Sequence, residues 1–222
     1  MDVVAWTLSN GQLVRTGSMT TDSLNEILAG VEEIKDGALC SIFNTCTGLT
    51  GSVEFPSLVS VGRSGLRTAF NYCTGLTGSV SFPMLTTVDS SGLLASFAGC
   101  TGLTSASFPM LTTVDSSGLY NTFYGCTGLT SVRFTELTSI GEHGFYSAFA
   151  GCTGLTSVSF PSLTTIGYAG LYQAFSGCTN LEFHFLADLS GNSQCTASYM
   201  GCSKAIVCFD IYSDSGSDDD DD

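Results

Sequence analysis

The sequence predicts a repeat solenoid of mixed α/β class, with about seven coils that each hold one parallel strand and one short helical or 3₁₀ turn. A recurring pentapeptide is the first observation behind this prediction. CTGLT begins at Cys46, Cys73, Cys100, Cys126 and Cys152, and CTNLE at Cys178 and a degenerate copy ending at Cys202 continue the series. The CTGLT and CTNLE copies are 26 or 27 residues apart, and the apolar residues between them recur in one fixed order.

A strand is expected in each unit because two apolar residues lie two positions apart, as on one face of a strand. In one unit these residues are Val132 and Phe134, with Arg133 between them. The equivalent pairs are Val53/Phe55, Val80/Phe82, Ala106/Phe108 and Val158/Phe160. A single unit cannot bury such a face alone, so the units are expected to stack into a parallel sheet.

The later apolar residues of each unit predict the helical or 3₁₀ turn, because they recur at positions i and i+4. Phe145 and Phe149 form one such pair. The equivalent pairs are Leu66/Phe70, Leu93/Phe97, Leu119/Phe123 and Leu171/Phe175. Together with Leu129, Leu137 and Ile140, these residues are the expected core of a unit.

Glycine recurs at two places in the unit, and we expect both to be coil corners with a left-handed backbone. The first set is Gly48, Gly75, Gly102, Gly128 and Gly154, matched by Asn180. The second set is Gly62, Gly141 and Gly167, matched by Asp89 and Asp115. Gly, Asn and Asp are the residues that tolerate a positive φ, which is the basis of this prediction.

The chain divides into three predicted parts: an N-terminal cap at 1–33, the solenoid at 34–205, and a C-terminal cap end with an acidic disordered tail at 206–222. Asp22 or Ser23, followed by LNEILAGVEEI, predicts a capped amphipathic helix over the open end of the core. The last ten residues contain only Ser, Gly and Asp, which is typical of a solvated disordered end. A weak calcium site is the alternative reading of this tail.

The repeat resembles a known family. The unit FPSLTTIGYAGLYQAFSGCTGLTSVSF, assembled from two copies in this chain, is similar to the BspA-like (Treponema-type) leucine-rich repeat, whose units read roughly P-x-x-V-x-x-I-G-x-x-A-F-x-x-C-x-x-L-x-x-I. The similarity covers about Ile34 to Cys202. This chain departs from the family in its longer unit, in FPxL for IPxxV, and in Asp89 and Asp115 where the family has Gly. The resemblance implies a leucine-rich-repeat solenoid used for binding, often in surface adhesins, and it carries over no particular binding residue.

Charge argues against nucleic acid as a partner. The chain has 6 Lys and Arg against 20 Asp and Glu, a formal net charge of −14, and its few basic residues are scattered. Seven of the acids lie in residues 210–222, so the rest carries 13 acids against 6 bases, or −7. No apolar stretch approaches the roughly 18 residues of a membrane span, and the N-terminus lacks the pattern of a secretory signal.

No enzymatic activity, cofactor or metal is expected. The chain lacks GxSxG, HExxH, phosphate-loop, dinucleotide-binding and EF-hand motifs. Its repeated cysteines are interpreted as a buried column of small apolar thiols, since no CxxC occurs and the two histidines, His143 and His184, occupy different repeat positions. A disulfide between Cys195 and Cys208, or between Cys202 and Cys208, is left open and would indicate an oxidising compartment.

Two columns of side chains are expected on the surface. On the strands, the outward column is Glu54, Ser81, Ser107, Arg133 and Ser159, with His184 as a further member, and it offers few anchors. On the turns, the outward column is Arg67, Leu94, Tyr120, Tyr146 and Tyr172, with Tyr124 and Tyr168 nearby. Aromatic residues carry much of the energy at interfaces, so these five column residues are the predicted partner contacts. In the alternative reading, the rings lie flat over the turn and cover the Phe beneath.

Threonines also recur, in two columns that begin at Thr47 and Thr50. Regular threonine arrays can order water on flat ice-binding solenoids, which is one hypothesis for these columns. A threonine at a coil corner is more simply a hydrogen-bonding turn residue.

The function expected from these features is adhesin-like recognition of a protein or surface-glycan partner, with self-association left open. The family resemblance implies a cell-surface or extracellular location, whereas the missing signal pattern leaves a virion or cytoplasmic location open. The alternative hypothesis is a structural subunit of a larger assembly, such as a virion or a surface appendage. Low surface charge and flat sides favour this alternative.

Overall fold

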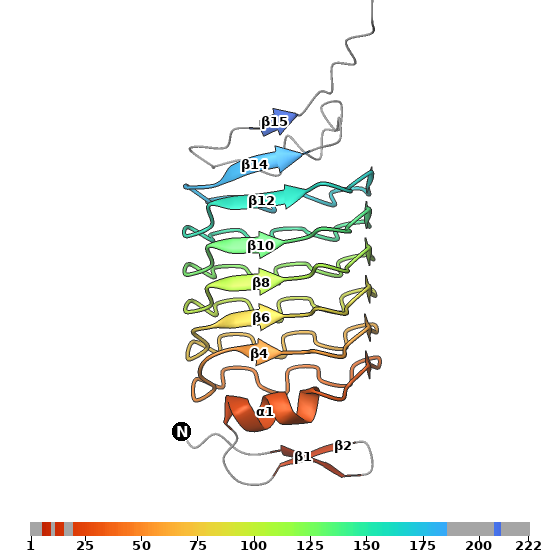
Figure 1. The fold of residues 1–222 in the computed structure, drawn as a ribbon, viewed down its shortest axis with the longest axis vertical. Helices are drawn as coiled ribbons and strands as arrows, with labels where there is room; N and C mark the ends of the chain where they lie inside the picture. Colours follow the sequence, from red (N-terminus) through yellow and green to blue (C-terminus); the bar gives the residue numbers. More distant parts are fainter. Residues whose placement is uncertain (1–5, 10–11, 16–19, 186–206, 210–222) are drawn as a thin grey trace, which may run out of the picture.

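A computed structural model describes residues 6–9, 12–15, 20–185 and 207–209, with side chains for residues 20–181. Figure 1 shows the coils stacked one above another along a single axis, which confirms the predicted solenoid of parallel strands. The described residues contain five complete coils, between Cys46 and Cys178, where the sequence predicts about seven. Partial coils at both ends add further strands to the stack.

Each coil contributes a strand to each of two parallel sheets. The front sheet contains β4 (Val53–Glu54), β6 (Ser79–Ser81), β8 (Ser105–Ser107), β10 (Ser131–Arg133), β12 (Ser157–Phe160), β14 (Glu182–Phe185) and β15 (Val207–Phe209). The side sheet contains β3 (Glu33–Ile34), β5 (Ser60–Val61), β7 (Thr87–Val88), β9 (Thr113–Val114), β11 (Ser139–Ile140) and β13 (Thr165–Ile166). Equivalent residues of successive coils pair in register, as Val132 does with Ala106 and Val158.

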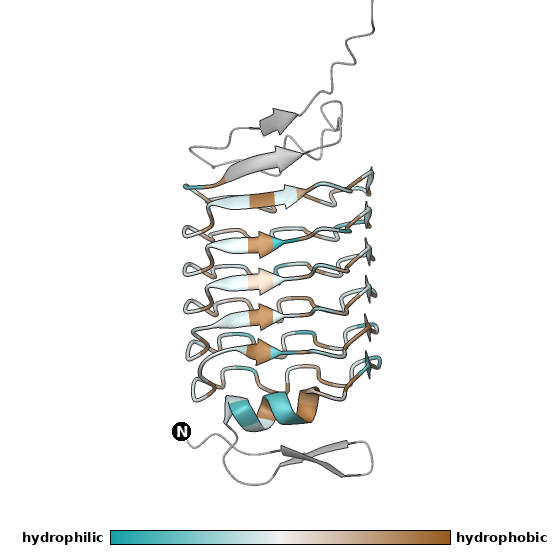
Figure 2. Cartoon of the chain, in the orientation of Figure 1, coloured by the Kyte–Doolittle hydropathy of each residue, from teal (hydrophilic) through white to brown (hydrophobic). Residues whose placement is uncertain are grey.

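The alternation expected for the front strands is present. Val132 and Phe134 are buried and Arg133 between them is exposed, and Figure 2 shows one hydrophobic position flanked by polar ones on these strands. The prediction of a single strand per coil is wrong, because the side sheet supplies a second. Its strands are two residues long, as in Ser139–Ile140, so they contain no alternation that a sequence pattern could reveal.

The third side of each coil is a run of hydrogen-bonded turns, where the sequence predicts a helical or 3₁₀ turn. Alternate amides bond within the coil, as when the Tyr120 N–H donates to the Ser117 carbonyl at 3.1 Å. The amides between them bond to the next coil, as when the Asn121 N–H donates to the Tyr146 carbonyl at 3.0 Å. Ser117 and Asn121 have φ values of 55° and 53°, so a left-handed residue recurs every fourth position. An α-helix would keep these bonds inside its own segment, so bonding between stacked coils replaces the expected helical turn.

Neither set of repeated glycines is left-handed, nor are Asp89 and Asp115, which match the second set, so the prediction of left-handed corners is wrong for both. Positive φ values among glycines fall elsewhere, for example at Gly125 and Gly151, immediately before the cysteines. The CTGLT glycines are required by the close approach of the neighbouring coil. A β-carbon on Gly102 or Gly154 would lie 2.6 Å from the Leu76 or Thr127 carbonyl oxygen, respectively. At Gly167, in the second set, a β-carbon would lie 2.7 Å from the Glu142 amide nitrogen.

Replacing one of these glycines should separate two coils. We expect Gly154→Ala to lower the free energy of unfolding by about 1–3 kcal/mol, because the added methyl group overlaps a backbone carbonyl that stacking holds in place. Urea unfolding followed by circular dichroism measures the change. Gly30→Ala is the matched control, because a β-carbon there meets no atom within 4 Å. Equal effects of the two substitutions would contradict the role assigned to close coil contact.

Two columns of stacked phenylalanines fill the core. The strand column is Phe55, Phe82, Phe108, Phe134 and Phe160, with ring centroids 4.6 to 5.4 Å apart. The turn column is Phe43, Phe70, Phe97, Phe123, Phe149 and Phe175, with ring centroids 5.1 to 5.6 Å apart. Rings of the two columns meet edge to face, as Phe108 meets Phe123 at 6.2 Å. The predicted core residues Leu129, Leu137 and Ile140 are also fully buried.

The cysteine column is buried as predicted, from Cys73 through Cys178, and Cys46 at the first coil is half-buried. Each of these five buried thiols donates to a phenylalanine carbonyl of the preceding coil, over 2.9 to 3.1 Å. Burial, and next the thiol of the following coil, raise the pKa of Cys73, Cys100, Cys126 and Cys152. These groups are therefore neutral structural thiols. The side chains of Cys195, Cys202 and Cys208 lie outside the described residues, so the cap disulfide stays a prediction.

Helix α1 (Thr21–Leu28) lies against the first coil, as Figure 1 shows, and its apolar residues Leu24 and Leu28 join the core. Its N-cap is Thr20, whose hydroxyl accepts the Ser23 N–H, where the sequence suggests Asp22 or Ser23. The Asn25 side chain donates to the Ser52 carbonyl and accepts the Glu54 N–H, both at 3.0 Å. This amide occupies backbone groups at the edge of β4 that would otherwise be open to another chain.

An antiparallel hairpin of β1 (Trp6–Ser9) and β2 (Gln12–Arg15) precedes the helix. The sequence analysis did not predict it, although the Asn-Gly pair at positions 10 and 11 is a common hairpin signal. The division of the chain into caps and solenoid at 33 and 205 stays a prediction, and residues 210–222 lie outside the described part.

Candidate functional site

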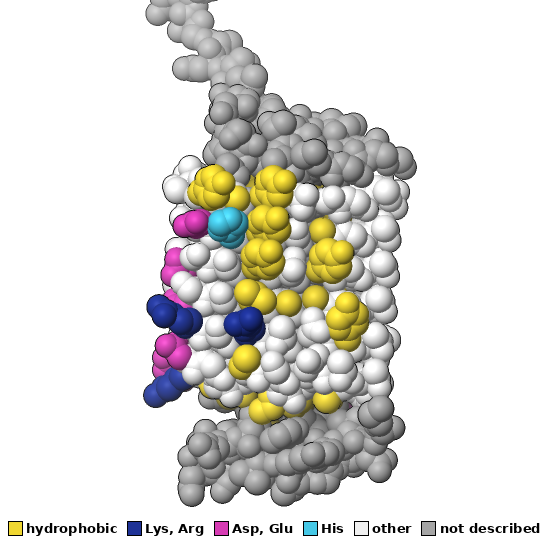
Figure 3. Space-filling model, turned by 180° about the vertical axis from the view of Figure 1, so that it is seen from behind, with side chains coloured by type: hydrophobic (Ala, Val, Ile, Leu, Met, Phe, Trp, Pro, Cys, Tyr) yellow, Lys and Arg dark blue, Asp and Glu magenta, His cyan; other side chains and the backbone are white. Residues whose placement is uncertain are grey.

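The predicted partner contacts form one column on the turn side of the solenoid. Figure 3 shows hydrophobic side chains aligned across successive coils on the face opposite the front sheet. Tyr120, Tyr146, Tyr172 and Leu94 are half-buried there, and Arg67 is exposed. Each of the five follows a buried residue of the turn, so its side chain is directed outward. We call these five residues the tyrosine column.

The rings in this column are stacked on one another. Tyr120 and Tyr146 have centroids 4.7 Å apart and planes only 2° apart, and Tyr146 and Tyr172 follow at 5.2 Å and 32°. Rings this close and this parallel overlap face to face, so they stand across the coils and do not lie flat over the turn. The alternative that the rings serve only as a flat cover for the phenylalanines does not fit this geometry. Their edges and hydroxyl groups face the solvent.

The phenol of Tyr120 is the most perturbed group in the column. Burial, and next the phenol of Tyr146, raise the pKa of Tyr120. As a phenol, its hydroxyl can both donate and accept a hydrogen bond.

His143 and Tyr168 extend the aromatic surface sideways. The His143 ring lies 5.8 Å from the Tyr146 ring and 5.6 Å from the Tyr168 ring, which it meets edge to face. Tyr168 is 72% exposed, and Glu142 lies 3.5 Å from the His143 ring nitrogen Nδ1. The repeat pattern predicts Tyr168 beside the column but does not predict His143 there. A signal for His143 is present in the sequence, because it lies three residues before Tyr146, and in these turns that spacing places the two side chains together.

The remaining exposed tyrosines are separate from the column. Tyr72 and Tyr124 are 56% and 50% exposed. Among the described residues, neither has a ring contact with the tyrosine column. They provide chemically matched controls on the same side of the molecule.

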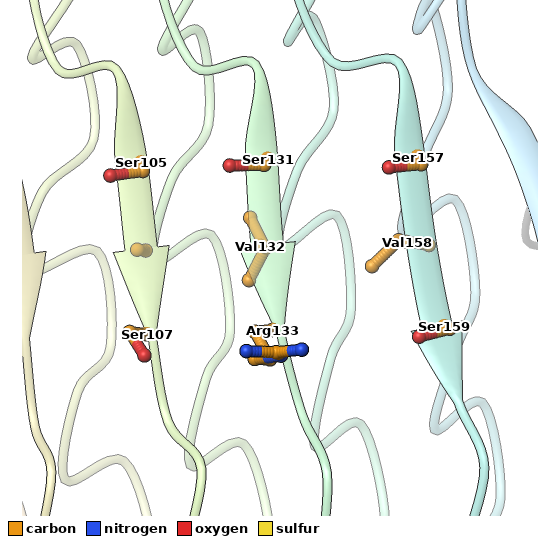
Figure 4. A pocket seen from close by; sticks show the side chains of 9 residues that line it. Ser105, Ser107, Ser131, Val132, Arg133, Ser157, Val158 and Ser159 are labelled. Carbon is orange, nitrogen blue, oxygen red and sulfur yellow. The ribbon is translucent and has the colours of Figure 1, made fainter.

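The front sheet carries the second predicted column, which is outward as expected and contains Glu54, Ser81, Ser107, Arg133 and Ser159. Across β8, β10 and β12 this surface forms an open pocket of about 720 Å³. Figure 4 shows serines on either side of Arg133 and no other long side chain among the labelled residues. The sequence predicts few anchors on this face, and the pocket was not predicted.

The threonine columns behave mainly as hydrogen-bonding corner residues. The hydroxyls of Thr104, Thr130 and Thr156 each donate to the carbonyl of the equivalent residue one coil earlier, at 2.9 to 3.2 Å. Thr86, Thr112, Thr138 and Thr164 make the same bond along the side sheet. These seven hydroxyls hold neighbouring coils together, as expected of turn residues. The ice-binding hypothesis for the column that begins at Thr47 stays a prediction.

The described residues contain no group of three His, Cys, Asp or Glu side chains arranged to hold a metal ion. No helix in the described part of the chain combines the length and apolarity of a membrane span. The two surfaces offer aromatic rings, hydroxyl groups and two guanidinium groups, those of Arg67 and Arg133. These groups suit the binding of another molecule.

Comparison with known proteins agrees with the geometry. The pattern of the BspA type leucine rich repeat region matches in six copies, over residues 23–147 and 121–205. The chain belongs to the BspA-type leucine-rich repeat family. Members of this repeat family generally serve in interactions with other proteins. No curated protein matches the chain.

Among solved structures, this BspA-type solenoid is similar to a leucine rich cell surface protein from Faecalibacterium prausnitzii. The two chains are 15% identical, with a TM-score of 0.31. The match covers 82% of this chain and spans 64% of the length of the other.

Proposed function

We propose that this protein is a non-enzymatic, adhesin-like binding module, and that its tyrosine column contacts a protein or surface-glycan partner. Membership of the BspA-type family supports an interaction role. The observation that carries the proposal is the stack of Tyr120, Tyr146 and Tyr172 at a solvent-facing surface.

Stacking prepares this surface for binding. Each of the three tyrosine rings packs on the ring of a neighbouring coil, so little side-chain entropy is lost when a partner docks. The three hydroxyls follow the coil spacing, and Leu94 and Arg67 continue the column by two more coils. A partner lying along the solenoid axis would meet aromatic edges, an aliphatic side chain and a cation in turn.

The test replaces the three tyrosines together. We expect Tyr120→Ser/Tyr146→Ser/Tyr172→Ser to weaken adhesion of protein-coated beads to mucin and matrix-protein surfaces by about a hundredfold or more, since aromatic anchors each contribute about 2 kcal/mol or more. The matched control, Tyr72→Ser/Tyr124→Ser, removes exposed tyrosines outside the column and should bind like the unmodified protein. Circular dichroism checks that both variants remain folded.

Unchanged adhesion of the folded triple variant would contradict the site, and failure of the unmodified protein to adhere would contradict the adhesin-like role. Light scattering of the unmodified protein and of the triple variant separates a partner surface from a surface for self-association. Loss of a dimer in the triple variant would assign the column to contacts between copies of this chain.

A further inference from the structure

The pocket on the front sheet combines one cation, Arg133, with five serine hydroxyl groups (Figure 4). Its outward side chains are Ser105 and Ser107 from β8, Ser131 and Arg133 from β10, and Ser157 and Ser159 from β12. Ala106, Val132 and Val158 also line the pocket, and these three apolar residues are buried. The polar groups that a ligand would meet here are therefore the serine hydroxyls and the Arg133 guanidinium.

Arg133 is available to such a ligand. The side chain is exposed, and its guanidinium has no ion pair or hydrogen-bond partner among the described residues. Strand pairing places Ser107 on one side and Ser159 on the other. Both are short, so the planar guanidinium can be approached from either side, as Figure 4 shows.

The five serine hydroxyls of the pocket also make no hydrogen bond within the described part of the chain. Parallel pairing in register spaces them at about 4.8 Å from strand to strand. They contrast with the corner threonines, whose hydroxyls are occupied by carbonyl groups of the preceding coil. The pocket thus combines unused hydroxyl groups with an unused cation.

The chemistry of these groups selects the ligand. A guanidinium matches a carboxylate in a two-point hydrogen-bonded geometry. Free hydroxyls match the hydroxyl groups of a sugar, whereas an apolar ligand would leave them unsatisfied. A single cation on a chain of net charge −14 favours a ligand with one negative charge at this position over a dianion.

We propose that the pocket around Arg133 binds an acidic saccharide, with the guanidinium on a sugar carboxylate and the flanking serines on sugar hydroxyls. This site is independent of the tyrosine column, which lies on the opposite face. It gives the protein a second binding surface of different chemistry.

Titration calorimetry with a short oligogalacturonate tests the proposal. We expect measurable binding by the unmodified protein, weaker at high salt because the contact is exposed to solvent. Arg133→Ser, which matches the serines at the same position in the neighbouring coils, should weaken binding about tenfold or more. Ser159→Glu, which places a carboxylate next to Arg133 in register, should weaken it similarly.

Two controls sharpen the result. Arg63→Ser removes the same charge from an exposed position outside the pocket, where the equivalent residues Ser90 and Ser116 are already serine, and should leave binding unchanged. The methyl-esterified oligogalacturonide, which lacks the carboxylate, should bind at least tenfold more weakly than the acid.

The proposal is overturned if the oligogalacturonate does not bind, if Arg133→Ser binds as well as the unmodified protein, or if the neutral ester binds equally. Preference for a sulfated oligosaccharide over the uronate would overturn the assignment to a carboxylate. The triple tyrosine variant should keep saccharide binding. Failure of this proposal is therefore distinguishable from failure of the adhesin-like function.

Discussion

The free energy of unfolding should fall by at least about 5 kcal/mol per pH unit once the pH exceeds the ordinary thiol pKa of about 8.5. Burial raises the pKa of Cys73, Cys100, Cys126 and Cys152 in the fold. Below pH 8.5 these thiols are protonated in both the folded and the unfolded state, so their titration does not change the free energy of unfolding with pH. Above it the unfolded chain loses their protons while the folded chain keeps them, so each thiol costs about 1.4 kcal/mol per pH unit.

Urea unfolding at a series of pH values, with a reductant present, measures this slope. Cys100→Ala should reduce the slope by about 1.4 kcal/mol per pH unit, because one buried thiol is gone. Cys40→Ala is the control, since Cys40 is exposed. Tyrosine and lysine titration contribute equally to all three proteins, so a slope that Cys100→Ala leaves unchanged would contradict the role of the buried thiols.

Phe97→Ala should lower the free energy of unfolding by about 3–5 kcal/mol. Phe97 is stacked between Phe70 at 5.1 Å and Phe123 at 5.6 Å, and it meets Phe82 edge to face at 6.3 Å. Its removal leaves a cavity that the regular backbone bonds between coils prevent from collapsing. Urea unfolding measures the loss.

Tyr124→Ala is the control for this substitution, because it removes a comparable ring that is 50% exposed, and its effect should be within about 0.5 kcal/mol. In a repeat protein, stability depends mainly on neighbouring coils. Hydrogen exchange should therefore increase first in the coils beside Phe97. Similar losses from Phe97→Ala and Tyr124→Ala would show that the phenylalanine column does not dominate the core.

Most of the inward-facing residues could be predicted from the sequence. The 26-residue period identifies equivalent positions, and the spacing of Val132 and Phe134 identifies the buried face of the front strands. The buried cysteines follow from the same period. Position in the repeat decides burial here, because every complete coil has the same neighbours above and below.

Local backbone structure was predicted less well. Phe145 and Phe149 are buried as their spacing suggests, but the backbone that carries them is not helical. Gly102 and Gly154 are present because a carbonyl of the preceding coil lies where a side chain would be. Both errors have the same origin. Hydrogen bonds and close contacts between coils decide the backbone conformation at these positions, and the local sequence pattern contains no record of them.

The candidate surfaces were predicted in part. The tyrosine column could be listed from the repeat, whereas the face-to-face contact of Tyr120 with Tyr146 and the approach of His143 depend on side-chain directions in the folded turn. The repeat pattern identifies the column that contains Arg133, but it does not predict the pocket around this residue. It depends on which neighbouring side chains are small, and so on the register between strands.

The sequence by itself determined that this chain is a BspA-type solenoid with a phenylalanine and cysteine core, because a repeated apolar pattern can be buried only by stacking its copies. The tertiary structure alone decided the second sheet, the succession of left-handed turns, the stacked tyrosines and the polar pocket. Each of these depends on contacts between residues about 26 positions apart. Such contacts exist only after the coils have been placed on one another.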